Sequence, residues 1–197
     1  MSSLKQTPSQ TVGPFFAYGL VPQQYGYAFT GVAGGDMATR ETEGEHIRIE
    51  GRVLDGEGTA VNDALIEIWQ ADARGRYAHP ADPRAANAHF KGFGRVGTGT
   101  DAQRRFIFDT VKPGSVDGHQ APHINVIVLM RGMLSHVFTR IYFSDERAAN
   151  AKDPVLATVP AARRETLIAK REQTSIGVVY RHDIHMQGDK ETVFFDV

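Results

Sequence analysis

Segments in which apolar and polar residues alternate recur along the chain from residue 46 onward. In residues 46–53, Ile47, Ile49 and Val53 alternate with charged or polar neighbours. A period of two is typical of a strand with one buried face. Other segments rich in β-branched and aromatic residues predict further strands over residues 64–71, 105–110, 123–130, 136–143, 177–184 and 191–196. Short strands separated by turn residues indicate an all-β fold, an antiparallel β-sandwich.

Two pairs of these segments have the spacing of hairpins. Five residues that include Gly132 separate 123–130 from 136–143, and a turn at 187–189 separates 177–184 from 191–196. Residues 64–71 carry apolar side chains in both phases, which predicts a strand covered on both faces. Residues 78–103 are interrupted by proline and glycine and are expected to form a loop.

Helical signals are few. Pro160 precedes a run of good helix formers, and this predicts a helix over residues 161–172. A shorter helix is expected within residues 145–152. Residues 1–45 show neither periodicity, and we expect an extended N-terminal arm followed by one β-sandwich domain over 46–197. Six aromatic residues are scattered in the arm, and we expect them to contact a partner chain: Phe15, Phe16, Tyr18, Tyr25, Tyr27 and Phe29.

Composition removes several classes of function. The chain has 22 Lys and Arg against 23 Asp and Glu, a net charge of −1, which argues against a nucleic-acid binder. It has no cysteine, so thiolate metal sites and cysteine nucleophiles are excluded. The polar first residues do not resemble a secretory signal, and no apolar run is long enough to cross a membrane. We therefore expect a soluble cytoplasmic protein.

Few side chains combine into a candidate site. His123 and Asn125 share one face of a predicted strand, either as metal or substrate contacts or as structural hydrogen-bonding groups. His182 and His185 are three residues apart on a predicted strand, which places them on opposite faces and disfavours a shared metal. Arg131 ends a central strand, where it presents its planar fork to a carboxylate or forms an ordinary surface ion pair. No glycine-rich segment leads into a helix, and no nucleophile elbow is present.

Taken together, several motifs resemble the intradiol ring-cleavage dioxygenases. The central segment runs from Ile49 to Tyr77 and contains the run Ile66-Glu67-Ile68-Trp69-Gln70-Ala71-Asp72. Residues 7–15, 111–114, 121–125, 140–143, 163–171 and 191–195 are similar to the protocatechuate 3,4-dioxygenases within that family. The resemblance covers nearly the whole chain and implies the β-sandwich fold that the strand pattern predicts.

The resemblance also implies a metal centre that this chain lacks. In the family, a non-haem ferric ion is held by two tyrosinates and two histidines, and phenolate is a hard anionic ligand that suits Fe(III). Here the family's His-x-His is His123 and Asn125, residues 78–92 contain no tyrosine, and Ser115 stands near the other tyrosine position. The chain is thus similar to the non-catalytic alpha chain, with Fe(III) held by a homologous beta chain and none by this one.

In that resemblance the alpha chain lines the substrate cavity of its partner. The matching positions are Thr11, Gly13, Pro14, Phe15 and Arg131, with Phe15 in place of a tyrosine found in some relatives. The implied reaction is O2-dependent cleavage of protocatechuate to 3-carboxy-cis,cis-muconate in an assembly of alpha–beta pairs. Two alternatives stay open: a self-sufficient dioxygenase with atypical metal ligands, and a non-enzymatic β-sandwich module that binds small aromatics.

Overall fold

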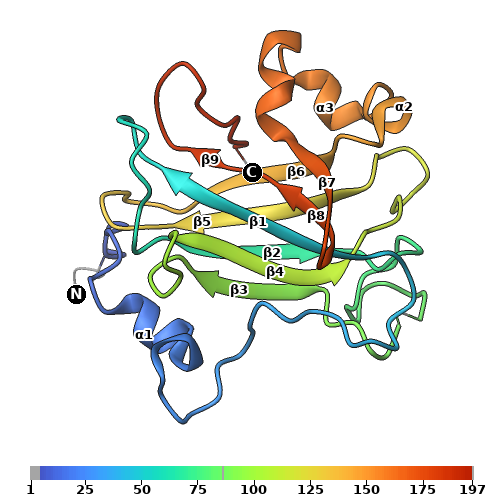
Figure 1. Cartoon of the computed structure of the whole chain (residues 1–197). Coiled ribbons are helices and arrows are strands. Elements are labelled where there is room, and N and C mark those ends of the chain that lie inside the picture. Colours follow the sequence, from blue (N-terminus) through green and yellow to red (C-terminus); the bar gives the residue numbers. More distant parts are fainter. Residues whose placement is uncertain (1–4, 86, 197) are drawn as a thin grey trace.

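Two facing layers of strands make up the body of the molecule in the computed structural model, which describes residues 5–85 and 87–196 (Figure 1). One layer has the order β3-β2-β5-β6 and the other β7-β8-β1-β4, and a short strand, β9, pairs with β1. The strands are β1 (His46–Leu54), β2 (Leu65–Gln70), β3 (Phe93–Gly97), β4 (Arg105–Val111), β5 (His123–Leu129), β6 (Val137–Phe143), β7 (Ile168–Thr174), β8 (Gly177–Arg181) and β9 (Ile184–His185).

The strand pairing is mixed, so the prediction of a purely antiparallel sandwich was wrong. β7 joins the layers, because Ile168 and Ala169 pair in parallel with β6 before residues 170–174 pair antiparallel with β8. β1 also pairs in parallel with β8 and β9. The long connection from β6 to β7 allows a parallel return, whereas a tight hairpin does not. Alternation of side chains reports which face is buried, and it carries no information about strand direction.

The core lies between the two layers and is built from the alternating apolar residues. Ile47, Ile49 and Val53 of β1 are buried there, as the period of two predicts. Ile66 and Ile68 of β2 join the same core, while Leu65 faces the other side and packs against the arm. Residues 64–71 are therefore covered on both faces, as expected. The β5–β6 hairpin is also confirmed, with His123 opposite Tyr142 in antiparallel register.

Strand β3 falls in a segment that was expected to be a loop. Its glycines suggested turns, yet at Gly94 the glycine makes room for packing. A Cβ on Gly94 would lie 2.7 Å from the sulfur of Met37 and 3.0 Å from the ring of Phe108. Met37 belongs to the arm and is fully buried. The end of the arm is thus part of the sandwich core, and the absence of a side chain at Gly94 leaves the space that Met37 fills.

Two further predictions fail at the C-terminal end. Residues 161–172 are a short 3-10 helix, η2 (Ala161–Leu167), followed by β7, because pairing of Ile168 and Ala169 with β6 outweighs helix propensity. Residues 191–196 form no named strand; Phe195 makes one isolated bridge to Phe138, and β8 pairs with β7 and β1 instead.

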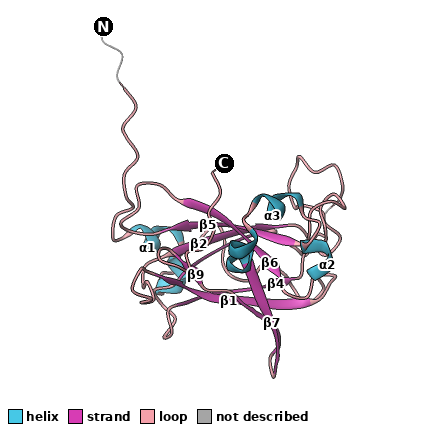
Figure 2. Cartoon of the chain, turned by 90° about the horizontal axis from the view of Figure 1, so that it is seen from above, coloured by secondary structure: helices cyan, strands magenta, loops and turns pink. Residues whose placement is uncertain are grey.

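The remaining helices are short and lie at the edges of the sandwich. The helix expected within 145–152 is confirmed as α2 (Arg147–Asn150), and α3 (Pro154–Thr158) follows with Asp153 as its N-cap. The arm contains α1 (Phe16–Leu20) and a 3-10 turn, η1 (Pro22–Tyr25). Figure 2 shows the first described residues of the arm projecting away from the layers before α1. Within the described residues, no helix has the length and apolar character needed to cross a bilayer.

Candidate functional site

Arg131 and Asp63 meet where two neighbouring strands end. β2 begins at Leu65 and β5 ends at Leu129, and these two residues lie opposite each other in antiparallel register. Asp63 precedes β2 and Arg131 follows β5, so the pairing brings both side chains to one edge. The Nε of Arg131 donates to Oδ2 of Asp63. The Arg131 side chain is 53% exposed, so its guanidinium is held at one end while it faces solvent.

The arm runs along the loop that follows Arg131. The backbone N–H of Gly132 donates to Oγ1 of Thr11 at 3.0 Å. The hydroxyl of Ser9 donates to the carbonyl of Leu134. These bonds join positions more than 120 residues apart in the sequence. They place Thr11 beside Arg131, two of the five positions that the family resemblance singled out.

The other three positions continue the same surface. Gly13, Pro14 and Phe15 come one residue after Thr11 and form the exposed turn into α1, in which the N–H of Phe16 donates to the carbonyl of Gly13 at 3.2 Å. Phe15 is 77% exposed. A Cβ at Gly13 would meet nothing within 4 Å, and its φ lies outside the left-handed region. The fold of this chain therefore gives no reason for glycine there, in contrast to Gly94.

The segment after this turn is anchored to the sandwich. Ala17 and Val21 bury against Leu65 on the outer side of β2. The side-chain amide of Gln24 bonds to both backbone groups of Gly97, accepting from its N–H at 2.7 Å and donating to its carbonyl at 3.2 Å. Gln24 thereby satisfies backbone groups at the edge of the sheet. These contacts hold the arm on its own domain, so the exposed turn has a fixed base.

Beyond this anchor, four aromatic side chains form a continuous exposed row, named here the aromatic row. Its members are Phe15, Tyr18, Tyr27 and Phe29. Neighbouring ring centroids lie 5.7–6.2 Å apart. Exposed fractions run from 37% for Tyr18 to 77% for Phe15. A contiguous apolar surface of this kind marks an interaction site more often than scattered exposed residues do.

At the other end of β5, His123 and Asn125 share a face as predicted. His123 is buried, its Nδ1 lies 2.8 Å from the carbonyl of Ala121, and burial lowers the pKa of the imidazole although this hydrogen bond opposes the shift. Burial raises the pKa of the Tyr77 hydroxyl, while a hydrogen bond with Asn125 acts in the opposite direction. The side-chain amide of Asn125 is therefore the hydrogen-bond partner of a protonated, neutral phenol.

The residues around His123 do not fit a ferric ion. Tyr142 is the phenol beside His123, with ring centroids 5.9 Å apart, and its hydroxyl lies 3.1 Å from Oδ1 of Asp153. Burial raises the pKa of Tyr142 to about 12, which keeps it a neutral phenol. Tyr142 is not at a ligand position of the family, and near the position of the second ligand tyrosine Ser115 donates to the carbonyl of Gln120. In the described part of the chain no three His, Cys, Asp or Glu side chains form a possible metal site.

An apolar pocket of about 530 Å³ lies on the outer face next to Asn125. Trp69 of β2, Phe93 of β3 and Phe195 line it together with Arg140 of β6. Trp69 also stacks on Tyr77, with centroids 5.8 Å apart and planes inclined by 6°. The aromatic lining and the volume of this pocket suit a small aromatic molecule.

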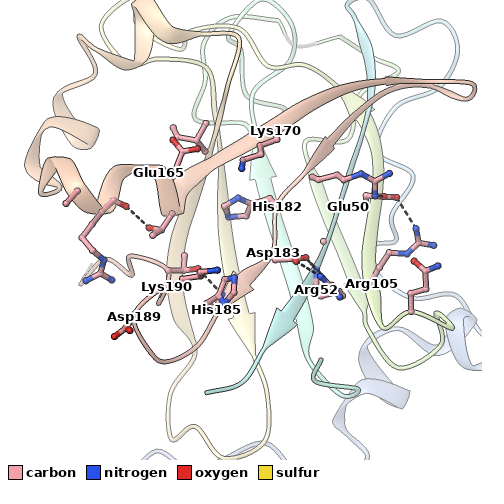
Figure 3. A pocket seen from close by; sticks show the side chains of 18 residues that line it. Glu50, Arg52, Arg105, Glu165, Lys170, His182, Asp183, His185, Asp189 and Lys190 are labelled. Atoms are coloured by element: carbon pink, nitrogen blue, oxygen red, sulfur yellow. Dashed lines mark hydrogen bonds and ion pairs between the residues drawn. The ribbon is translucent and has the colours of Figure 1, made fainter. Parts of the chain in front are cut away.

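Another pocket, of about 950 Å³, lies between β1, β8, β9 and η2 (Figure 3). His182 and His185 both line it, so the prediction of opposite faces was wrong: β8 ends at Arg181, and the alternation does not continue through the break before β9. Burial lowers the pKa of His182 to about 4, so it is neutral at pH 7. Arg52 and Asp183 pair across the pocket at 2.7 Å.

Sequence reasoning missed two parts of this arrangement. Asp63 stands two residues before β2, and only the antiparallel pairing of β2 with β5 brings it to Arg131. The aromatic row was noticed as scattered residues, and its continuity depends on the turns of α1 and η1. The sequence did contain a signal for this ion pair: Asp63 comes just before one predicted strand, and Arg131 comes just after another strand that could pair with it.

Three comparisons with known proteins bear on this site. The family model described as Dioxygenase matches residues 27–188. The chain is similar to the protocatechuate 3,4-dioxygenase alpha chain of Burkholderia cepacia, with 58% identity over 198 residues that cover 100% of both chains. It is also similar to the protocatechuate 3,4-dioxygenase beta chain of that organism, with 35% identity over 166 residues, or 77% of this chain and 68% of that one.

A solved structure supports the fold. The intradiol ring-cleavage dioxygenase from Tetranychus urticae has a TM-score of 0.57 and 18% identity, with coverage of 81% of this chain and 88% of that chain. At this identity the likeness shows the fold alone. It places the mixed sandwich among the folds that intradiol ring-cleavage dioxygenases adopt.

Proposed function

This chain belongs to the dioxygenase family, and on that premise we propose that it is the alpha chain of a protocatechuate 3,4-dioxygenase. With a homologous beta chain it catalyses cleavage of the C–C bond between the two hydroxyl-bearing carbons of protocatechuate, and one atom of O2 is added to each of these carbons, which gives the two new carboxylates of 3-carboxy-cis,cis-muconate. The chain is thus a subunit of an oxidoreductase, and its working form is a hetero-oligomer of alpha–beta pairs.

We assign the ferric ion to the beta chain. Non-haem iron belongs to the chemistry of this family, and the donor set in this chain argues against a second iron here. The amide of Asn125 replaces one imidazole, and Tyr142 is a neutral phenol committed to Asp153. A ferric ion needs anionic oxygen ligands for charge balance, and neither residue supplies one.

The observation that supports the proposal is a contact between the arm and the loop after Arg131. Thr11 accepts from the N–H of Gly132, although 120 residues separate Thr11 from Arg131, and Gly13, Pro14 and Phe15 follow within four residues of Thr11. All five of these positions are exposed. Within this chain, a side chain at position 13 would meet no other atom within 4 Å, so the fold does not require glycine there. A glycine at such a position suits a surface where another molecule approaches the backbone closely. We propose that this edge closes the substrate cavity of the beta chain, with Arg131 facing the carboxylate of protocatechuate.

Two other functions are weighed against this one. A self-sufficient dioxygenase would need a metal site in this chain, and among the described residues no group of three His, Cys, Asp or Glu side chains offers one. A binding module for small aromatics would use the pocket at Trp69 and Phe93. Reconstitution separates the three: only the proposed function predicts an inactive isolated chain that restores ring cleavage when a beta chain is added.

The experiment is reconstitution of the alpha–beta complex with the unaltered chain and with Arg131→Ala. Direct hydrogen bonds to a charged group contribute about 1.5–3 kcal/mol and water-mediated contacts less. We expect Arg131→Ala to raise KM for protocatechuate about tenfold, equivalent to about 1.4 kcal/mol. Turnover of catechol, which has no carboxylate, should change little. Arg131→Lys should fall between, because it keeps the charge and loses the planar fork.

Two results would count against the proposal. Absence of ring cleavage in the reconstituted complex would remove the function itself. Equal damage by Arg131→Ala to protocatechuate and catechol would leave the subunit role in place, and it would show that Arg131 is a structural or subunit contact.

A further inference from the structure

The guanidinium of Arg131 is held by one edge only. Its Nε donates to Asp63, whose side chain is 21% exposed. Among residues 5–85 and 87–196, Nη1 and Nη2 of Arg131 have no hydrogen-bond partner. A guanidinium can bind a carboxylate through two N–H bonds at its Nε–Nη2 edge or at its Nη1–Nη2 edge. Asp63 occupies Nε and so blocks the first edge, while the Nη1–Nη2 edge stays open for a second carboxylate.

The loop that carries Asp63 lies beside the arm. Burial, then Tyr18 and then the negative charge of Asp63 raise the pKa of Tyr25 in η1. A Cβ at Gly99 would lie 2.9 Å from the carbonyl oxygen of Asn62 and would also collide with the Tyr25 hydroxyl. The loop that carries Asp63 is thus packed against η1 and the end of β3, and this packing supports the backbone next to Asp63.

From this geometry we propose that Asp63 is a positioning residue for Arg131, and that it sets the preference of the completed site for substrates that carry a carboxylate. The inference rests on the proposed function. A free arginine side chain loses several rotatable bonds when it binds an anion, and the ion pair with Asp63 removes part of that cost beforehand. Asp63 acts on the substrate only through the orientation of the guanidinium.

The same carboxylate also has an opposing effect, because it adds negative charge near an anionic substrate. One observation makes orientation the larger effect. The bond to Asp63 lies at Nε, away from the Nη edge, so the Asp63 carboxylate is on the far side of the guanidinium from a carboxylate bound there. Loss of Asp63 should therefore weaken carboxylate binding.

The test uses the reconstituted alpha–beta complex with Asp63→Asn, Asp63→Glu and Arg131→Ala, and with Asp63→Asn combined with Arg131→Ala. KM and kcat are measured for protocatechuate and for catechol. We expect Asp63→Asn to raise KM for protocatechuate about fivefold, equivalent to about 1 kcal/mol, with kcat and the catechol constants nearly unchanged. Asp63→Glu should recover part of the loss. In the Arg131→Ala background, Asp63→Asn should have no further effect.

Glu43→Gln is the matched control, because Glu43 forms an exposed ion pair with Arg74 at 2.6 Å outside this edge. A loss from Asp63→Asn that persists without Arg131, or that affects catechol equally, would overturn the inference by showing a structural role. A lower KM in Asp63→Asn would overturn it by showing that Asp63 restrains Arg131. If Arg131→Ala itself does not distinguish the substrates, the assigned role of Arg131 fails and this inference fails with it.

Discussion

His182 is the buried side chain whose charge state most directly links this fold to pH. It is 5% exposed, its Nε2 has no hydrogen-bond partner within the described ranges, and burial lowers its pKa to about 4. An unfolded histidine titrates near 6.5, so between pH 6.5 and pH 4 the unfolded state binds a proton at this histidine and the folded state does not. The stability from neutral His182 is complete above pH 6.5 and is lost as the pH falls toward 4.

This linkage gives a prediction at the residue scale. Between pH 7.5 and pH 5, His182 should account for a loss of about 2 kcal/mol in the free energy of unfolding. Denaturant unfolding at the two pH values measures it, and His182→Gln should remove that part of the loss. His119→Gln, at an exposed loop position, is the control and should behave as the unaltered chain. Equal pH dependence in His182→Gln and the unaltered chain would contradict the assignment.

Single residues also show which features of the site can be predicted from the sequence. The shared face of His123 and Asn125 follows from strand geometry alone, because positions two apart always lie on one face. The roles of Thr11 and Arg131 depended on family resemblance, since no local pattern joins positions 120 residues apart. Asp63 was not found at all. Its partner is set by the pairing of β2 with β5, which is a property of the assembled sheet.

At the scale of elements, strands with clear alternation were predicted well and those without it were not. β1, β2, β4, β5 and β6 each bury an alternating apolar face. β3 was missed because its glycines make room for Met37 and Phe108. β7 was taken for helix because its charged residues are good helix formers, and pairing across the layers decides its conformation.

The aromatic row gives a prediction at this scale. If it contacts the partner, Tyr27→Ser with Phe29→Ser should weaken the alpha–beta complex at least tenfold, because two large rings lose their buried area. The free energy of unfolding of the isolated chain should hardly change, since both rings are exposed there. Sedimentation velocity measures the association. Ile176→Ser, which removes an exposed apolar side chain from the β7–β8 turn, is the control.

The expected pattern in that experiment separates an interface from a structural element. Normal assembly by the double variant would show that the row is an exposed surface without a role in the complex. Loss of folding in the isolated chain would show that the rings stabilise the arm itself.

At the scale of the whole molecule, this chain has the fold of the intradiol ring-cleavage dioxygenases, and its sandwich matches a solved intradiol enzyme over 81% of its length. His123 bonds to the carbonyl of Ala121, and Tyr142 beside it bonds to Asp153. The functional edge lies at the opposite end of β5, where the arm and Arg131 meet. We propose that the two chains divide these tasks: the beta chain holds the iron, and this chain shapes the cavity around the substrate.

Iron content, measured together with the visible spectrum, tests this division most directly. The isolated chain, loaded with iron under the conditions that load the alpha–beta complex, should contain no stoichiometric iron and show no tyrosinate-to-iron absorption band. The complex should contain one iron per alpha–beta pair and show that band. An isolated chain that is coloured and carries close to one iron would contradict the account, because the donor set around His123 would then be a working metal site.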